Sequence, residues 1–238
     1  MKKLFVMAIA AVMSLGASAQ LISSNTMTHK ASKNYSRLSI SYNSLSFDKD
    51  FKDVDGISGL SLAWTKGISI SQTTPLFVET GLGVTYAWGS EEESESDYGI
   101  TATEEVKHSF LNLTVPVNLV YKYEIPNSGV TLAPYVGIYL RGNILAKTED
   151  EYTVSGQGYN DSDSEETNWF DAIDDNEPGY GANRFSIGWN IGVGVEWSKL
   201  YVGIAYGSDF NKYVDIDESG VKANTKISTF SATVGFNF

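Results

Sequence analysis

Acidic side chains at alternate positions are the first candidates for chemistry in this sequence. Asp161, Asp163 and Glu165 place three carboxylates at every second position of a short acidic stretch. Calcium-binding loops also present oxygen ligands at alternate positions, but they place a glycine sixth and a bidentate glutamate twelfth. The stretch lacks both, so these residues are weak candidates for a divalent-metal site. The more ordinary interpretation is a solvated, self-repelling surface loop.

Two other groups of side chains could support catalysis. His108 is followed directly by Ser109, but neighbouring residues of a strand point to opposite faces and cannot form a base–nucleophile pair. No third group that would orient the base can be identified. Glu79 and Glu196 could act as an acid and a base, although the architecture predicted below buries them in a narrow interior. We therefore expect neither an enzyme nor a cofactor; the alternative is a lipid-modifying activity that depends on His108.

The elements that position these residues repeat with a period of two, which is typical of strands. Eight segments carry leucine, valine, isoleucine and aromatic residues on one parity. The other parity carries ten glycines and many serines and asparagines. An apolar outer face with a small, polar inner face predicts an all-β fold, an eight-stranded antiparallel up-and-down transmembrane β-barrel. The segments are residues 37–47, 57–66, 76–88, 106–123, 131–145, 184–197, 200–208 and 225–238.

The acidic residues mark one end of this barrel. Connections 48–56, 89–105, 146–183 and 209–224 hold 26 of the 29 acidic residues, and they alternate with short turns. Long polar loops outside and short turns in the periplasm are the layout of outer-membrane barrels. The connection 146–183 exceeds the usual length of a structureless loop, so we expect a hairpin extension or a docking surface for an unidentified protein partner. The net charge of −12 argues against nucleic acid as a partner.

The N-terminal residues differ from the rest of the chain. Lys2 and Lys3 precede an apolar run that ends in Ala17-Ser18-Ala19, which predicts a cleaved signal peptide over residues 1–19. Residues 20–35 are polar and aperiodic and are expected to form a flexible periplasmic lead. The barrel then occupies residues 36–238. The absence of cysteine excludes a thiolate metal site and a cysteine nucleophile.

Aromatic residues on the outward parity cluster near the ends of the strands. Such clusters predict the two girdles that amphipathic rings form at the membrane interfaces. The periplasmic girdle would contain Trp64, Tyr123, Trp197 and Phe238, and the outer girdle Tyr42, Tyr86, Trp88, Phe185, Tyr206 and Phe230.

Few charged residues fall on the inward parity. Arg37, Glu79, Lys122 and Glu196 all map near the periplasmic end, and their charges sum to zero. We expect them to form an interior ion-pair plug, because a buried charge without a partner is strongly destabilising. Arg141 also points inward. An eight-stranded interior is filled by side chains, which favours a structural or interaction role over a small-solute channel.

Three stretches carry a resemblance to a known family. Phe110–Tyr123, Ala133–Tyr139 and the terminal Val234-Gly-Phe-Asn-Phe238 are similar to the Bacteroidota outer-membrane β-barrel family that is often called PorT-like. The resemblance runs from about residue 35 to the end and implies an outer-membrane location in a Gram-negative bacterium. It implies no specific activity. It also implies recognition of Phe238 by the outer-membrane assembly machinery. An outer-membrane location predicts contact with membrane lipid and lipopolysaccharide, and the acidic loops suggest a separate hypothesis, weak bridging to lipopolysaccharide phosphates through divalent cations.

Overall fold

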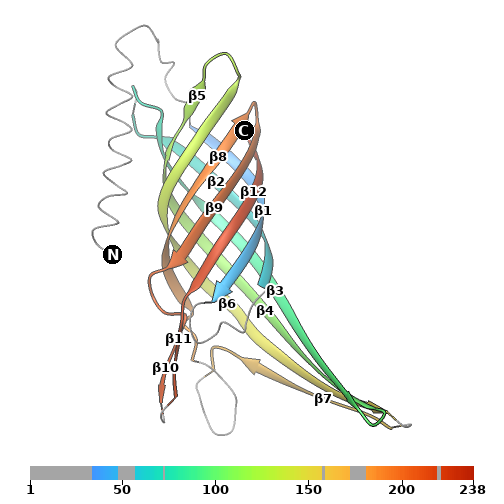
Figure 1. Cartoon of the computed structure of the whole chain (residues 1–238). Coiled ribbons are helices and arrows are strands. Elements are labelled where there is room, and N and C mark those ends of the chain that lie inside the picture. Colours follow the sequence, from blue (N-terminus) through green and yellow to red (C-terminus); the bar gives the residue numbers. More distant parts are fainter. Residues whose placement is uncertain (1–33, 48–56, 72, 157–158, 172–180, 219–220) are drawn as a thin grey trace.

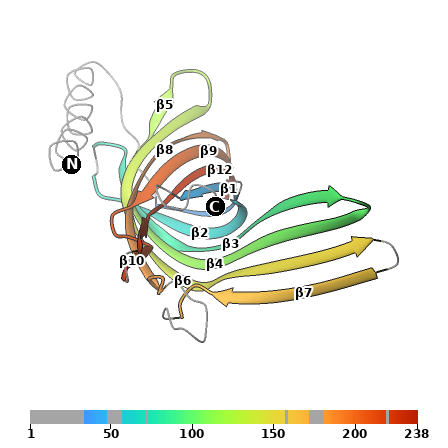
Figure 2. The same ribbon diagram turned by 60° about the horizontal axis from the view of Figure 1, so that its bottom comes forward.

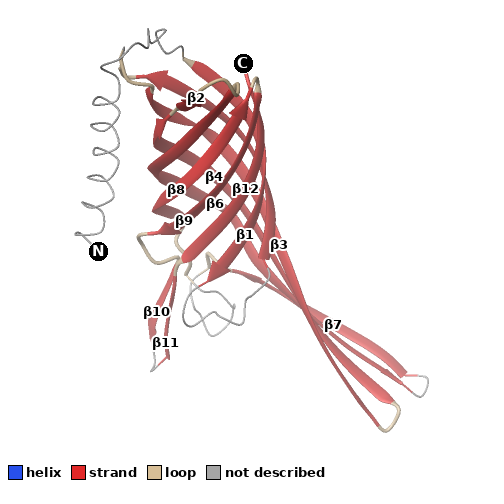
Figure 3. Cartoon of the chain, turned by 45° about the horizontal axis from the view of Figure 1, so that its top comes forward, coloured by secondary structure: helices blue, strands red, loops and turns tan. Residues whose placement is uncertain are grey.

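The computed structural model describes residues 34–47, 57–71, 73–156, 159–171, 181–218 and 221–238. The regular structure of these residues is strand throughout (Figure 3). No helix within these ranges is long and apolar enough to cross a membrane. The predicted signal peptide, most of the predicted lead and the connection 48–56 lie outside the described residues. The strands are β1 (Tyr35–Phe47), β2 (Ile57–Ser69), β3 (Leu76–Asp97), β4 (Ile100–Tyr121), β5 (Tyr123–Ile125), β6 (Val130–Gly156), β7 (Tyr159–Asn168), β8 (Phe185–Trp197), β9 (Leu200–Asp209), β10 (Val214–Glu218), β11 (Val221–Thr225) and β12 (Ile227–Asn237).

Eight of these strands close a hydrogen-bonded ring. The order is β4-β3-β2-β1-β12-β9-β8-β6, every pairing is antiparallel, and β6 pairs with β4 to complete the circle. Figures 1 and 2 show the resulting barrel, with the C-terminus at the end where the short turns lie. The prediction of an eight-stranded antiparallel barrel is therefore confirmed. Closure matters because an open edge in lipid would leave backbone groups unpaired.

The alternating pattern places apolar side chains outside and small ones inside. Registers such as Ile40 opposite Val234 and Leu62 keep one parity on one face around the ring. On the inner face, glycines of β8 make room for large rings. A Cβ at Gly192 or Gly194 would collide with the ring of an inward-pointing tyrosine, Tyr135 or Tyr201 respectively. The interior is therefore filled by tyrosines that lie over glycines, which fits a narrow barrel.

Three strands continue beyond the ring and build a second feature. The far halves of β3, β4 and β6 pair with one another, and β7 adds to β6. We call this four-stranded sheet the arm (residues 90–97, 100–107, 147–156 and 159–168); it projects away from the barrel at its long-loop end (Figures 1 and 2). The arm corrects the expected strand ends at residues 88, 106 and 145. For the connection 146–183, the expected hairpin extension is present over its described first half.

The arm escaped the sequence pattern because both of its faces meet water. Its strands are held by cross-strand hydroxyl pairs, with Ser94 and Thr103 at 3.2 Å and Ser96 and Thr101 at 2.9 Å. The β3–β4 hairpin closes at Tyr98 and Gly99, both with positive φ (49° and 80°). That geometry belongs to the tight turn that joins two antiparallel strands. Strand pairing therefore continues where hydrophobic alternation has stopped.

Candidate functional site

A cluster of charged side chains fills the barrel at the short-turn end. Arg37 on β1 lies 3.1 Å from Glu79 on β3 and 2.9 Å from Glu196 on β8, measured between guanidinium nitrogens and carboxylate oxygens. The Nζ atom of Lys122 lies 2.9 Å from Glu196. The structure thus brings together all four residues that the sequence places on the inward parity at this end. We call this group the plug.

Aromatic and amide groups surround the plug. The Tyr35 hydroxyl donates a hydrogen bond of 2.7 Å to Glu79, and Arg37 donates through Nε to Asn237 at 2.9 Å. The guanidinium carbon of Arg37 lies 3.6 Å from the centre of the Tyr201 ring. Lys122 lies 3.3 Å from the centre of the Tyr35 ring. These contacts tie strands from opposite sides of the barrel across the lumen.

A second interior ion pair lies nearer the long-loop end. Arg141 on β6 pairs with Asp209, the last residue of β9, and the Asp209 carboxylate also accepts a hydrogen bond of 2.7 Å from Tyr139. The expectation that Asp209 belongs to an exposed loop is wrong. Its side chain has no exposed surface. The sequence pattern could have placed Asp209 inside the barrel, because Asp209 has the same parity as Tyr201, an inward-facing residue of the same strand.

Aromatic side chains close the barrel at the long-loop end. Trp169, which follows β7, is 1% exposed and packs at ring distances of 5.2 to 6.0 Å against Phe47, Phe110 and Tyr213. Its indole nitrogen donates to the Thr148 hydroxyl at 2.8 Å. We call this group the cap; its other buried members are Leu45, Ile57, Ala87, Ala146, Ala182, Val214 and Ile227.

His108 belongs to the cap. Its Nδ1 atom lies 2.8 Å from the Thr148 hydroxyl, and its ring stands against Phe110 and Trp169. His108 is buried, with 6% of its surface exposed. Ser109 points to the opposite face of β4. The geometry therefore places His108 in packing and hydrogen bonding, and the Thr148 hydroxyl that it contacts is buried and also accepts the indole hydrogen bond of Trp169.

The arm carries most of the negative charge near the long-loop end. It contains fourteen acidic residues and two lysines. Glu92, Glu105 and Glu151 stand side by side on three neighbouring strands, an arrangement that is destabilising without a counter-charge. Lys107 supplies part of it, with its Nζ atom 3.1 Å from Glu105 and 3.0 Å from Glu151. Lys147 pairs with Glu166 at 2.7 Å.

Asp161, Asp163 and Glu165, the weak metal candidates, lie on β7 of the arm. As alternate residues of one strand they share a face in a line, about 7 Å apart from one to the next. Ligands of one calcium ion must all lie about 2.3–2.6 Å from it, so this line does not converge on a single ion. Within the described ranges no group of three or more histidine, aspartate or glutamate side chains could hold a metal.

The model of the outer membrane protein beta-barrel domain family matches residues 7–238. The chain belongs to this family. The protein is therefore an outer-membrane β-barrel. In barrels of this kind short turns generally lie in the periplasm and long loops outside the cell. No curated protein matches the sequence.

Solved structures of bacterial outer-membrane proteins resemble this outer-membrane barrel only distantly. Ail, the attachment invasion locus protein of Yersinia pestis, is 14% identical over 87% of this chain and 99% of its own, with a TM-score of 0.39. Neisserial surface protein A is 15% identical over 88% and 100%, with a TM-score of 0.39. The outer membrane enzyme PagL is 14% identical over 84% and 97%, with a TM-score of 0.44. Similarities at this level carry no argument about activity.

The aromatic residues expected in the two girdles all lie on the outside of the outer-membrane barrel. Their side chains are 43% to 77% exposed. Many leucines, valines and isoleucines of the same parity are exposed as well. Tyr86 and Trp88 stack on each other at 5.8 Å between ring centres. An exposed apolar band of this extent suits hydrocarbon rather than water.

Proposed function

We propose that this outer-membrane barrel is a closed structural and interaction protein whose arm binds a partner outside the cell. The observation that carries the proposal is the arm itself: three strands of the barrel wall continue beyond the ring as a hydrogen-bonded sheet, and the outer edges of β3 and β7 in the arm are unpaired among the described residues. The plug and the cap fill the lumen at its two ends with buried side chains. The extracellular surface is therefore the part of the molecule that is available for recognition.

Site-specific photo-crosslinking on intact cells tests this role. We expect a crosslinking residue at Ser94 or Ser162, on the arm, to form discrete protein adducts. The matched control is Ser128, in the short turn between β5 and β6 at the periplasmic end. Adducts at the arm positions that are absent at Ser128 would support the proposal. An arm that yields no protein adduct on cells that display the folded barrel would contradict it.

A small-solute channel is the competing function, and planar-bilayer recording separates the two. We expect the refolded protein to show no steady conductance, because Arg37, Glu79 and Glu196 on one side and Trp169 on the other obstruct the lumen. A porin with a larger diameter than this barrel, inserted in the same bilayer, is the positive control. A stable conductance step in the wild-type protein would favour the channel.

Two narrower assignments, the branch of the family and the role of Phe238, are also proposals. We propose that the barrel belongs to the PorT-like branch, on the strength of Phe110–Tyr123 and Ala133–Tyr139 alone. We also propose that Phe238 is the residue that the assembly machinery recognises. In support, Phe238 exchanges backbone hydrogen bonds with Ser36 at the seam of the barrel, and its side chain is 63% exposed.

A further inference from the structure

The two faces of the arm carry different side chains. Directly opposed residues of its four strands share a face, and neighbours along one strand alternate between the faces. The face that includes Glu91 continues the inner wall of the barrel, since Glu91 has the same parity on β3 as Ala87, a buried member of the cap. We call this the inner face and the opposite one the outer face. A partner of the arm therefore has two distinct surfaces to recognise.

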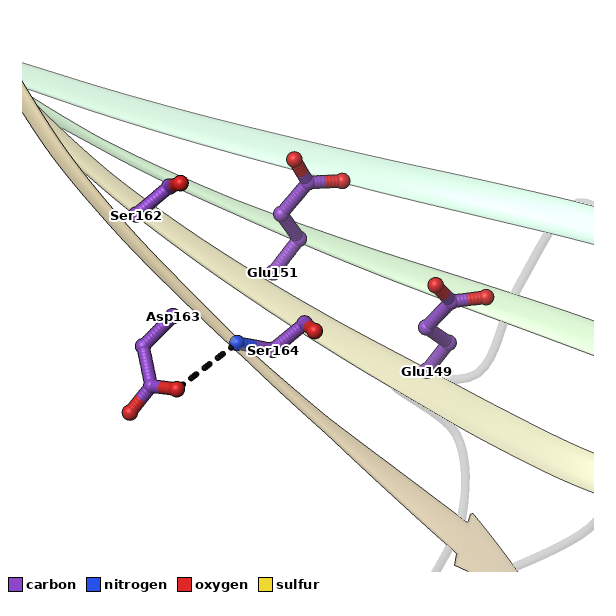
Figure 4. Close-up of a pocket in the computed structure, with 5 residues that line it drawn as sticks. All are labelled: Glu149, Glu151, Ser162, Asp163 and Ser164. Atoms are coloured by element: carbon purple, nitrogen blue, oxygen red, sulfur yellow. Dashed lines mark hydrogen bonds between the residues drawn. The ribbon is translucent and has the colours of Figure 1, made fainter.

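The outer face of the arm is polar along its centre and holds both lysines. Lys107 and Lys147 form their ion pairs with glutamates of this face. Figure 4 shows Glu149 and Glu151 of the outer face on one side of β7, and the carboxylate of Asp163 on the other. Five of the fourteen acidic residues of the arm lie on the outer face. Between them the two central strands carry hydroxyl groups, on Thr101, Thr103, Thr153 and Ser155.

The inner face carries an apolar stripe along the same two central strands. The stripe consists of Ile100, Ala102 and Val106 on β4 and of Tyr152 and Val154 on β6. Ala102 stands directly opposite Val154, and the stripe begins beside the cap, since Val106 is the next inward residue after His108. Ile100 and Tyr152 are 47% and 50% exposed. The described residues therefore leave about half of each of these large side chains uncovered.

Two rows of carboxylates flank the apolar stripe. One row occupies the odd-numbered positions of residues 91–97 on β3, and the other those of residues 161–165 on β7. Glu104 and Asp150 lie between the rows and line a hollow beside Tyr152. The inner face thus holds nine of the fourteen acidic residues of the arm and neither of its lysines. An apolar centre with negative charge on both sides complements a ligand with an apolar centre and positive flanks.

The inner face also opposes like charges to which the arm supplies no lysine. Glu104 stands directly opposite Glu93, and Asp150 directly opposite Glu165. Pairs of this kind destabilise a sheet. On the outer face Lys107 provides the counter-charge for the corresponding row of glutamates. A cationic ligand on the inner face would therefore stabilise the arm as well as bind to it.

The dimensions of the inner face fit an α-helix. The acidic rows lie on the two outer strands of the four-stranded arm (Figure 2), three inter-strand steps or about 14 Å apart. A helix with its side chains is about 10–12 Å across, so one helix can lie over the central strands with a row on each side. The shortest arm strands, of about eight residues, extend about 26 Å, the length of about 18 residues of helix.

We propose that the inner face of the arm binds a cationic amphipathic helix of another protein or peptide. The apolar side of the helix would lie on the stripe, and lysine or arginine on both flanks of that side would reach the two acidic rows. The proposal rests on the proposed role of the arm and names the chemical class of its partner. It requires the stripe and both rows together, which distinguishes it from attraction of any polycation to an acidic surface.

Two peptides of one composition test this requirement. Both have about 18 residues of leucine, alanine, lysine and glutamine and a fluorescent label. The first places its leucines in one stripe with lysines along both flanks, and the second spreads the lysines evenly around the helix. Fluorescence anisotropy with the full chain in zwitterionic nanodiscs measures affinity, and empty nanodiscs correct for binding to lipid. We expect the first peptide to bind about tenfold more tightly. Equal affinity would overturn the proposal.

Charge variants of the two rows locate the helix. Glu93→Gln with Glu95→Gln removes two charges from the β3 row, and Asp161→Asn with Asp163→Asn removes two from the β7 row. We expect each pair of changes to weaken the amphipathic peptide about fivefold, because a helix between the rows contacts both. Heat-modifiable gel mobility verifies that the variants are folded. A loss that is confined to one row would refute a helix that lies between them.

Two further variants separate apolar contact from charge. Tyr152→Thr with Val154→Thr keeps the charge of the arm and removes much of the stripe, so affinity should fall about tenfold. The matched control Glu92→Gln with Glu149→Gln removes two charges from the outer face and should leave affinity within about twofold. Full affinity in the stripe variant, or a fivefold loss in the outer-face control, would overturn the proposal. The crosslinking on cells does not depend on these peptides, so this proposal can fail while the role of the arm stands.

Discussion

Replacing Arg37 with alanine is expected to lower the free energy of unfolding of the barrel by about 3–5 kcal/mol. The change removes the cation beside the buried carboxylate of Glu79, which keeps its hydrogen bond from the Tyr35 hydroxyl, and it leaves Glu196 paired with Lys122. It also empties the space beneath the Tyr201 ring. Urea titration of the protein folded in lipid vesicles, followed by heat-modifiable gel mobility, measures the loss.

The control for this experiment is Lys199→Ala, which removes one positive charge from an exposed position at the same end of the barrel. Exposed substitutions of this kind usually change stability by less than about 0.5 kcal/mol. The double variant Arg37→Ala with Glu79→Ala should be less unstable than the sum of the single changes, since the two side chains are in contact. Stability of Arg37→Ala equal to that of the control would show that the plug does not hold the barrel together.

Side-chain parity explains how much of the interior could be predicted. Inside a barrel the alternation of faces is enforced by lipid on one side and a crowded lumen on the other, so Arg37, Glu79 and Glu196 could be placed inward from their position in the sequence. The same rule applies to Asp209, but the predicted strand ended at Ser208, because Asp209 was assigned to the following acidic connection. The partner of Arg141 was therefore missed by one residue.

The arm and the cap could not be predicted in the same way. Beyond the membrane both faces of a strand meet water, so β3, β4, β6 and β7 lose their alternation although their backbones remain paired. The cap depends on Trp169, which returns to the barrel mouth after a whole hairpin. Nothing in the local sequence distinguishes a buried tryptophan at the end of an acidic strand from an exposed one. Such a contact is fixed by the packing of distant residues, here Phe47 and Tyr213.

The plug and the cap stabilise the barrel through different physics. The plug is a set of charges that depend on one another in a place from which water is largely excluded, so removal of one partner is costly. The cap is an apolar cluster at the end of the lumen, and its contribution depends on packing density and on one buried indole hydrogen bond. Loss of the plug should therefore lower the stability of the whole barrel. Loss of the cap should first lower the local stability of the arm and of the barrel mouth.

Replacing Trp169 with alanine is expected to destabilise the cap by about 3–5 kcal/mol, the range for removal of a fully buried aromatic side chain. The indole packs against rings from β1, β4 and the segment after β9, and it holds the Thr148 hydroxyl that His108 also contacts. Hydrogen exchange of the Thr148 and Phe110 amides measures this local loss. Trp169→Phe retains one ring but loses the indole hydrogen bond, worth about 1 kcal/mol, and part of the packing, so its effect should be smaller than that of Trp169→Ala.

The pattern of exchange decides whether the cap is a separate unit. If Trp169 fastens the root of the arm to the barrel mouth, amides near Thr148 and Phe110 should exchange faster in Trp169→Ala, while amides around Arg37 in the plug stay protected. Gel mobility of the folded barrel should then be unchanged, because the eight-stranded ring does not use the indole. Unchanged exchange at Thr148 would show that the mouth is held by the strand ladder alone. Equal acceleration at both ends would show that plug and cap form one cooperative core, in which case the arm is anchored by the whole barrel rather than by its mouth.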